Sequence, residues 1–384
     1  SLAPVIDGHV TSLITAIILM YFGLGPIKGF ATTQIISLLL SLFTGIMVSR
    51  LITEMLMSKG RHLKYFTNFS KGIFQKANFQ FIKNRKIGYT ISVVLMLLGV
   101  GSFFNGFDYG VEFSGGRSYV IEFDQKHQVS DVREGLHTYL DNKHPIVKTL
   151  GTSNQMNITT DYLFDKSDKE VGDQVTQAIF NGLQKNNLIA SNVQFETFKS
   201  EYIKGIQSVS PAISKDLVNG AKWAIIYSVI AICLYIFIRF RKFQYSAGTI
   251  ISLVHDALIT LAVFSFCRSF VPFSLEIDQH FIAALLTIIG FSMNDTVIVY
   301  DRAREYFAKN PNGDKAEILN KAINSTLTRT VMTSFTLFIV AVILFIFGGE
   351  VLRGFAFAMS IGVLVATYSS IFLAAPLLLD LDKK

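Results

Sequence analysis

Long apolar stretches, separated by short polar or basic segments, make up most of this chain. An α-helix needs about 20 mostly apolar residues to cross the ~30 Å hydrocarbon layer of a membrane. Eight stretches meet this requirement. The pattern therefore predicts a polytopic α-helical membrane protein, with spans at 9–25, 27–52, 86–105, 219–239, 246–267, 280–302, 329–348 and 351–377.

The segment 106–218 has a different pattern, with shorter apolar runs between many polar positions. Its periodicity predicts four strands and two helices in the order βαββαβ, which is the order of a ferredoxin-like split unit. The strands are expected at 118–123, 146–150, 156–160 and 193–198, and the helices at 129–140 and 168–183. We expect one soluble α+β domain, a fold that by itself indicates no function.

Composition and charge agree with this division. Hydrophobic residues make up 51% of the chain, charged residues only 16%, and the mean hydropathy is +0.43. Basic residues gather in the connector at 53–85 and in the turn after the fourth span, so both segments are expected in the cytoplasm. Both chain ends then lie in the cytoplasm, and 106–218, with 11 Lys and Arg against 15 Asp and Glu, lies outside. The net charge of +7 is thus a topology signal that favours membrane lipid and indicates no nucleic-acid partner.

An internal repeat divides the chain. Residues 21–31 match 346–356, and 42–46 match 367–371 at the same offset. Each copy is an apolar helix, a tight glycine turn, a basic residue, Gly-Phe-Ala and a helix rich in small residues. The alternative, that any two membrane hairpins look alike, does not explain a turn that matches position by position.

The first two spans therefore resemble the end of an earlier half. Because no initiator Met is present, we expect the chain to begin within a longer polypeptide. The expected parts are the last two spans of the earlier half (1–52), a basic cytoplasmic connector (53–85), the first span of a second half (86–105), the soluble domain (106–218) and a five-helix remainder (219–384).

Asp295 is the first candidate for chemistry, because it lies within a long apolar span, after Ser292 and Asn294. An ionisable side chain in hydrocarbon costs several kcal/mol and usually serves ion or proton movement. With Arg302 at the cytoplasmic end of the span, Asp295 is expected ~10 Å inside the membrane. Asn294 and Ser292 are expected to hydrogen-bond it. The alternative is a buried carboxylate that only joins helices.

Arg329 is the only cation that the next span offers, since no other charge precedes Glu350. Two interpretations remain open at this point. Arg329 could extend to the lipid headgroups from the first turn of its helix. It could instead face Asp295 and change partners as that carboxylate gains or loses a proton.

His255 and Asp256 are adjacent near the middle of the fifth span. A histidine beside an aspartate at membrane depth is typical of a proton relay, because imidazole titrates near physiological pH. Neighbours diverge by ~100° on a helix, so we expect the two side chains not to face one partner. A helix–helix hydrogen bond is the alternative.

The remaining polar residues indicate structural roles. Asp301, Arg302 and Arg304 are expected to cap the cytoplasmic interface, and Asp7 and His9 to be solvated or interfacial before the first span. The two cysteines predict no disulfide framework. With no nucleophile triad, metal-ligand spacing or nucleotide motif in the sequence, we expect a protein that is not an enzyme and uses no cofactor.

Several motifs of this chain resemble one known family. Residues 107–116, 255–256, 292–302, 329–330 and 348–355 resemble SecF, and 7–50 resemble the end of SecD. Together they are similar to the carboxy-terminal part of a fused bacterial SecDF, a protein of the resistance-nodulation-division (RND) superfamily. One departure is Gly8-His9, where SecD more often has Ala-Asn.

The resemblance implies an auxiliary subunit of the Sec preprotein translocase in the bacterial cytoplasmic membrane. Such proteins are believed to use a proton gradient, or sodium in some relatives, to help draw polypeptide across the membrane. By position, Asp295 matches the membrane carboxylate of the SecF half and Arg329 matches its partner. The implied partners are the SecYEG translocon, SecA, YajC, a YidC-type insertase and unfolded preprotein.

Two other functions stay open on the sequence. One is an RND-type exporter of small molecules or lipids, which would need a defined ligand pocket and larger paired soluble domains. The other is a passive scaffold of the translocon, which would tolerate neutralising Asp295, Asp256 and Arg329 together.

Overall fold

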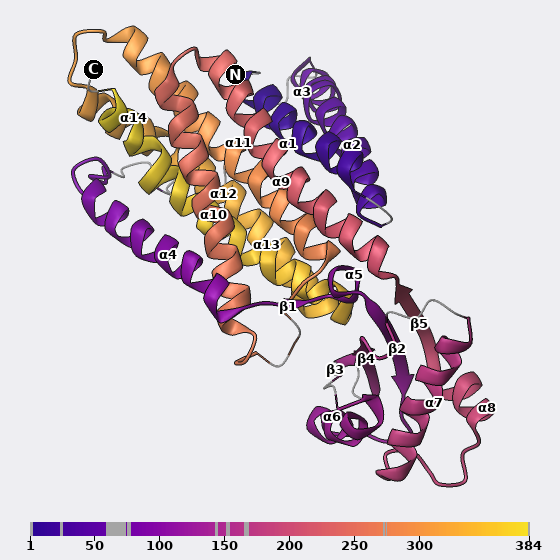
Figure 1. Ribbon diagram of the computed structural model, residues 1–384. Helices are drawn as coiled ribbons and strands as arrows, with labels where there is room; N and C mark the ends of the chain where they lie inside the picture. Colours follow the sequence, from indigo (N-terminus) through magenta and orange to yellow (C-terminus); the bar gives the residue numbers. More distant parts are fainter. Residues whose placement is uncertain are drawn as a thin grey trace.

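The computed structural model describes residues 3–23, 26–58, 74, 78–142, 145–150, 154–164, 169–271, 273 and 275–382. These residues form a helical bundle with a small α+β domain at one end, and both chain ends lie at the other end (Figure 1). Eight helical segments are long and apolar enough to cross a membrane, which confirms the predicted fold class. Most of the basic connector and residues 24 and 25 of the repeated turn lie outside the described residues.

The helices of the bundle are mostly longer than the predicted spans. They are α1 (Ala3–Phe22), α2 (Pro26–Phe43), α3 (Ser49–Ser58), α4 (Arg85–Asn105), α9 (Pro211–Phe240), α10 (Phe243–Cys267), α11 (Gln279–Lys309), α12 (Lys315–Phe347), α13 (Gly349–Ser369) and α14 (Ala375–Leu381). Hydropathy predicts only the part of a helix that lies in the membrane, whereas the capping residue sets where the helix begins. Ser210, Asp278 and Asp314 each accept a backbone N–H in the first turn of α9, α11 and α12.

Helix α11 is the centre of the bundle. It packs against α1, α12 and α13, and 83% of its most hydrophobic window is buried. Small residues allow this close approach. A Cβ added at Gly362 of α13 would lie 2.2 Å from Ile288 of α11, so the two helices touch where the glycine lacks a side chain.

The two copies of the sequence repeat share an uncommon local structure. A five-residue π-helix follows α2 at Thr44–Val48 (η1), and another follows α13 at Ser370–Ala374 (η4). Single-turn π-helices are rare and often occur at functional sites. The similarity of the two helix–turn–helix copies therefore extends from sequence to backbone conformation.

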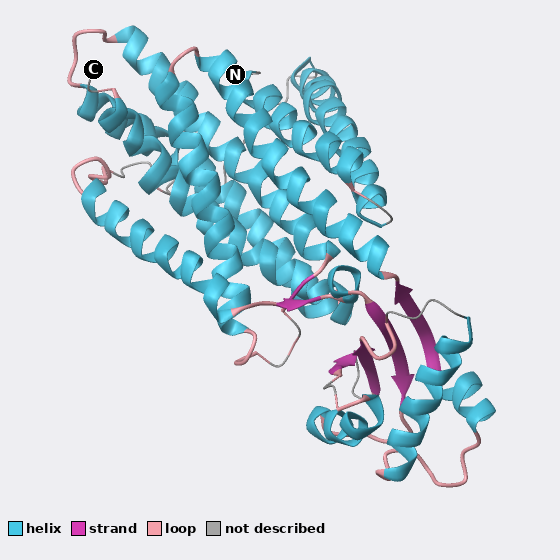
Figure 2. Cartoon of the chain, in the orientation of Figure 1, coloured by secondary structure: helices cyan, strands magenta, loops and turns pink. Residues whose placement is uncertain are grey.

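The soluble domain contains a four-stranded antiparallel sheet with the strand order β3-β4-β2-β5 (Figure 2). Its elements are β2 (Gly116–Glu122), α6 (Val129–His137), β3 (Ile146–Leu150), β4 (Gln155–Thr160), α7 (Lys169–Lys185), α8 (Phe195–Thr197) and β5 (Ile203–Val209). Tyr119 and Ile121 of β2 pack with Leu136 of α6 and Ile179 of α7 in one buried cluster. The order βαββαβ agrees with the prediction.

The position of the last strand was predicted wrongly. Residues 195–197 form α8, a π-helix follows at Phe198–Tyr202 (η3), and the strand is Ile203–Val209. The apparent alternation at 193–198 comes from Val193 and Phe195. Phe195 and Phe198 are three residues apart, the spacing of one helix face, and their rings pack on Phe180 with centroids 5.7 and 5.3 Å away. The true strand lies at a sheet edge and is mostly exposed, so it lacks the buried alternation that marks a strand.

Two further strands join the soluble domain to the bundle. Strand β1 (Asp108–Tyr109) pairs in parallel with β6 (Glu276–Ile277), which directly precedes α11. A short helix, α5 (Val111–Ser114), connects β1 to the sheet and packs against α9. Only Ser210 separates β5 from α9, so the sheet and the bundle are joined here without an intervening loop.

Candidate functional site

Asp295 lies fully buried on the central helix α11. Its carboxylate accepts hydrogen bonds from two residues of α12. Ser334 donates to Oδ2 at 3.2 Å, and Thr333 lies at the limit of hydrogen bonding, 3.5 Å from Oδ1. Both donors are neutral hydroxyls, so in the described part of the chain the Asp295 carboxylate has hydrogen bonds but no cation within ion-pairing distance.

The hydroxyl of Ser334 is part of a longer chain. Thr367 of α13 donates to Ser334 Oγ at 2.6 Å and can donate instead to the carbonyl of Val363, at 2.7 Å. The carboxylate of α11 is thus connected through α12 to α13. Hydroxyl groups rotate freely and act as donor or acceptor, so this chain can adapt to a protonated or an ionised Asp295.

The ion pair with Asp295, which was one of the two interpretations of Arg329, is not formed in the described part of the chain. Arg329 is exposed, and it lies in the middle of α12 and not in the first turn, because this helix begins at Lys315. It is one turn away from the site, since Thr333 also donates to the Arg329 carbonyl at 3.0 Å. The guanidinium of Arg329 therefore starts from the turn of α12 that adjoins Thr333 and Asp295.

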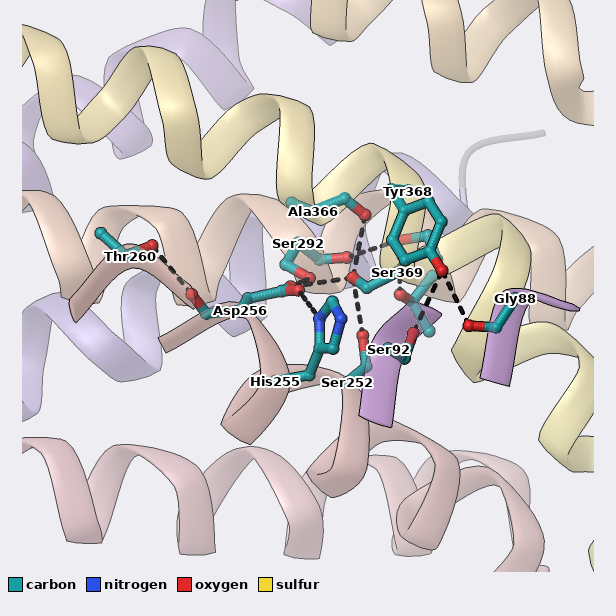
Figure 3. A network of polar contacts seen from close by, with 12 residues as sticks. Gly88, Ser92, Ser252, His255, Asp256, Thr260, Ser292, Ala366, Tyr368 and Ser369 are labelled. Carbon is teal, nitrogen blue, oxygen red and sulfur yellow. Dashed lines mark hydrogen bonds and ion pairs between the residues drawn. The ribbon is translucent and has the colours of Figure 1, made fainter. Parts of the chain in front are cut away.

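A second buried carboxylate lies on α10 (Figure 3). Asp256 Oδ2 accepts hydrogen bonds from Ser292 of α11 at 2.6 Å and from Ser369 of α13 at 2.9 Å. Its Oδ1 lies 2.9 Å from Nδ1 of His255. The imidazole of His255 therefore folds back onto Asp256, while the other partners of Asp256 are the hydroxyls of Ser292 and Ser369.

His255 is also fully buried, and it approaches the first span of the second half. Its ring stacks on Tyr368 with centroids 5.9 Å apart, and the Tyr368 hydroxyl donates to the Gly88 carbonyl of α4 at 2.8 Å. Nε2 of His255 has no hydrogen-bond partner among the residues that the structure describes. Such a nitrogen is unusual in a protein interior and leaves one position at which a proton or water can bind.

Hydroxyl groups at the end of α13 lie between the two carboxylates. Besides Thr367 and Ser369, Ser370 lies 2.9 Å from Thr296 of α11 and opens the π-helix η4. Ser292, which was expected to bind Asp295, binds Asp256 instead. The sequence signal that could have revealed this arrangement is the run of hydroxyl residues at 367–370 within an apolar segment.

Asn294, which was also expected to hydrogen-bond Asp295, points towards α1. Its side chain lies against Gly8 of α1, where an added Cβ would be 2.1 Å from Oδ1. Among the described residues it makes no hydrogen bond to Asp295. The glycine at position 8 therefore gives this amide the room to lie between α1 and α11.

Asp7 was expected to be solvated or interfacial, and the structure buries it. Arg239 of α9 donates to both carboxylate oxygens, with Nε at 3.1 and 3.0 Å, and the Tyr235 hydroxyl donates at 2.6 Å. Arg239 also approaches Asp301 of α11 at 3.8 Å. This ion pair joins α1 to the second half of the bundle, at the end away from the soluble domain.

The fold and these contacts define a multi-pass membrane protein with carboxylates in the centre of its bundle and a ferredoxin-like domain outside it. The sequence matches the family described as "Protein export membrane protein SecD/SecF, C-terminal" over residues 189–384. Residues 100–126 match the "SecD/SecF GG Motif". The chain belongs to the SecD/SecF family.

Relatives carry two domain arrangements. The chain is 40% identical over 310 residues to the protein translocase subunit SecF of Rhodothermus marinus, covering 80% of this chain and 95% of that protein. It is 31% identical over 389 residues to the protein translocase subunit SecDF of Brucella abortus, covering all of this chain and 48% of that protein.

The fold is also that of a solved structure. SecDF from Thermus thermophilus, described as a translocon-associated membrane protein, superposes with a TM-score of 0.82 at 27% identity. The match covers all of this chain and 48% of that one. A SecDF structure in a super-membrane-facing form gives a TM-score of 0.68. The chain thus spans about half the length of the SecDF proteins that it matches.

Proposed function

We propose that this chain is part of an auxiliary subunit of the Sec preprotein translocase, which couples a proton or sodium gradient to late-stage protein export and membrane insertion. The observation that carries the proposal is the environment of Asp295. The carboxylate is fully buried, and its hydrogen-bond donors in the described part of the chain are neutral hydroxyls. Burying an uncompensated charge is costly, so the ionised state favours the arrival of a proton, a cation or a cationic side chain.

Arg329 is the cationic side chain that can arrive. We propose that it is displaced from Asp295 when the carboxylate is protonated, and that it approaches over one helical turn when the carboxylate is ionised. The two arrangements would differ in the packing of α12 on α11. One elementary charge moved through 100 mV supplies about 2.3 kcal/mol, so a few ions are enough for a modest domain movement.

Asp256 and His255 would extend the relay. Asp256 shares α11 and α13 with the Asp295 network, through Ser292 and Ser369. We propose that protons pass between the two carboxylates along the hydroxyls of α13. Asp256 and Asp295 would then lie on one proton path. The packing of α11 against α13 would change when either carboxylate gains or loses a proton.

The proposed location is the bacterial cytoplasmic membrane, with both chain ends in the cytoplasm and 106–218 on the outer side. Both described ends lie away from the soluble domain, which supports this orientation. The proposed partners are the SecYEG translocon, SecA, YajC, a YidC-type insertase and the unfolded preprotein.

The test uses the full-length protein that contains this chain, reconstituted with the Sec translocase in vesicles that carry an ion gradient. Asp295→Asn should abolish gradient-dependent release of preprotein and leave ATP-driven export intact. Asp216→Asn, at an exposed position on α9, is the matched control. Normal gradient-dependent release by Asp295→Asn at equal protein levels would remove Asp295 from the mechanism. Normal release after neutralising Asp256, Asp295 and Arg329 together would indicate a passive scaffold.

A further inference from the structure

The central helix α11 is attached directly to the soluble domain. Strand β6 ends two residues before α11 begins, and it pairs with β1 in the register Asp108–Glu276 and Tyr109–Ile277. The Gly110 amide adds a hydrogen bond to the Ile277 carbonyl at 3.0 Å. The strand that precedes the helix of Asp295 is therefore hydrogen-bonded to β1, the strand that leads through α5 to the sheet.

An ion pair makes a second attachment, from the edge strand β3 of the sheet. Lys148 of β3 pairs with Glu276 of β6, and the two side chains are only 18% and 15% exposed. Strand β3 also lies against α13. No covalent connection joins β3 to β6 nearby in sequence, so these contacts can open without breaking the chain.

Asp278 lies at the centre of this region. Its carboxylate caps α11 by accepting the Phe281 amide at 2.7 Å. A Cβ added at Gly110 would be 2.8 Å from the Asp278 Cβ and 2.8 Å from Glu112 Oε2, so the stem of the soluble domain packs directly onto this acid. The charged and titratable groups that face Asp278 are Glu112 of α5, Lys148 of β3, Glu276 of β6 and His280 of α11.

We propose that Lys148, Glu276 and Asp278 form a joint that fixes the soluble domain to the start of α11, so that the sheet and the helix that carries Asp295 move as one body. Lys148 and Glu276 are positioning residues in this proposal, acting through α11. The joint is on the side of the soluble domain and is distinct from the carboxylates within the membrane. It gives the ion-driven movement proposed above a path to the soluble domain.

The joint should close more tightly in acid. Burial, helped by the negative charge of Glu112, raises the pKa of Asp278 to about 6 in the closed joint, against the Lys148 and His280 charges that lower it. A solvated aspartate has a pKa of about 3.9. Protonation therefore favours closure. The closed state gains its full stabilisation from Asp278 below the solvated pKa and loses it as the pH rises through about 6. This stabilisation changes the closing equilibrium by at most on the order of 100-fold.

Hydrogen exchange of the Gly110 amide measures closure, because this amide is protected only while it donates to Ile277. In the full-length protein in nanodiscs, Lys148→Glu and Glu276→Lys should each speed this exchange by about fivefold or more. The double charge reversal should restore it to within about twofold. Lys199→Glu, which breaks the exposed Lys199–Asp173 pair within the domain, is the control and should leave this amide unchanged. Wild-type protection in both single variants, or no restoration in the double one, would overturn the joint.

Asp278→Asn tests the acid response, because asparagine also caps helices and so preserves the start of α11. After correction for the intrinsic effect of pH on exchange, the wild-type amide should be better protected at pH 5 than at pH 7.5. Asp278→Asn should remove the difference. Equal protection of the wild type at both values, or a persistent difference in Asp278→Asn, would contradict acid closure.

Transmission is measured separately, by gradient-dependent preprotein release with the same charge reversals. Loss in each single variant and recovery in the double one would support transmission through the joint. Normal release in a variant whose joint is shown to be open would refute it. This part rests on the proposed function, whereas the exchange measurement does not, so a failure of Asp295→Asn to affect release leaves the structural joint standing.

Discussion

Ser334 of α12 donates its hydroxyl proton to the Asp295 carboxylate of α11 at 3.2 Å, while Thr367 of α13 donates to Ser334. Three helices therefore meet in one chain of hydrogen bonds that ends on a buried acid. Hydrogen bonds in such a chain strengthen one another in a low-dielectric interior. A proton on Oδ2 of Asp295 makes Ser334 the acceptor of this bond, and Thr367 can then turn to the Val363 carbonyl of its own helix. The protonation of one carboxylate is thus linked to a contact between two other helices.

Ser334→Ala should reduce gradient-dependent export by about tenfold or more, because a hydrogen bond to a charged group contributes about 1.5–3 kcal/mol. The measurement is the initial rate of preprotein release in reconstituted vesicles with equal protein content. Thr336→Ala is the matched control on the same helix, since Thr336 is exposed and its hydroxyl bonds to the carbonyls of Met332 and Thr333. Equal losses in the two variants would show that the effect does not come from Asp295.

Asp256→Asn should lower the free energy of unfolding by about 1–3 kcal/mol, because an amide nitrogen replaces one of the two carboxyl oxygens that Ser292, Ser369 and His255 contact at full burial. Unfolding in detergent micelles is the measurement. Ser360→Ala is the control, as Ser360 is buried but bonds to the carbonyl of Ala356 in its own helix. If Asp256 only joins helices, Asp256→Asn should leave gradient-dependent export unchanged once the protein is folded. A relay role predicts that export falls as well.

Arg329→Gln should leave the free energy of unfolding within about 0.5 kcal/mol of the wild type, because the side chain is exposed. Gradient-dependent export should nevertheless fall, since the guanidinium would no longer be available to an ionised Asp295. Both quantities should be measured on the same preparation of the full-length protein. A stability loss as large as the one expected for Asp256→Asn would mean that Arg329 has a structural role, and unchanged export would exclude it from coupling.

Asp7→Asn should lower the free energy of unfolding by about 2–4 kcal/mol, because it leaves Arg239 partly buried without its main partner. Asp301, 3.8 Å from Arg239, should recover part of this loss. Glu54→Gln provides the comparison, since it breaks the Arg50–Glu54 pair on the exposed face of α3 and should change stability by no more than about 0.5 kcal/mol. Similar small effects in both variants would show that the buried pair does not hold α1 in the bundle.

A site residue could be predicted from the sequence where its own residue type is unusual for its segment. A lone carboxylate in an apolar span identifies Asp295, whatever its neighbours are. The partners could not be predicted in the same way. Asp7 and Arg239 are 232 residues apart, and each residue taken alone is typical of a membrane interface. His255 illustrates the same limit at short range, because helix geometry sets where a side chain begins and not where its ring rotates.

By itself, the sequence determined the number of membrane spans, the order of elements in the soluble domain and the repeat, because each of these depends on local periodicity or on chain order. Only the tertiary structure decided that Ser334 faces Asp295, that Ser292 faces Asp256 and that β1 pairs with β6. Those contacts depend on how the helices rotate and cross, which is set by packing all of them at once. The same reason explains the misplaced last strand, because Phe195 and Phe198, three residues apart, both pack on Phe180 of α7.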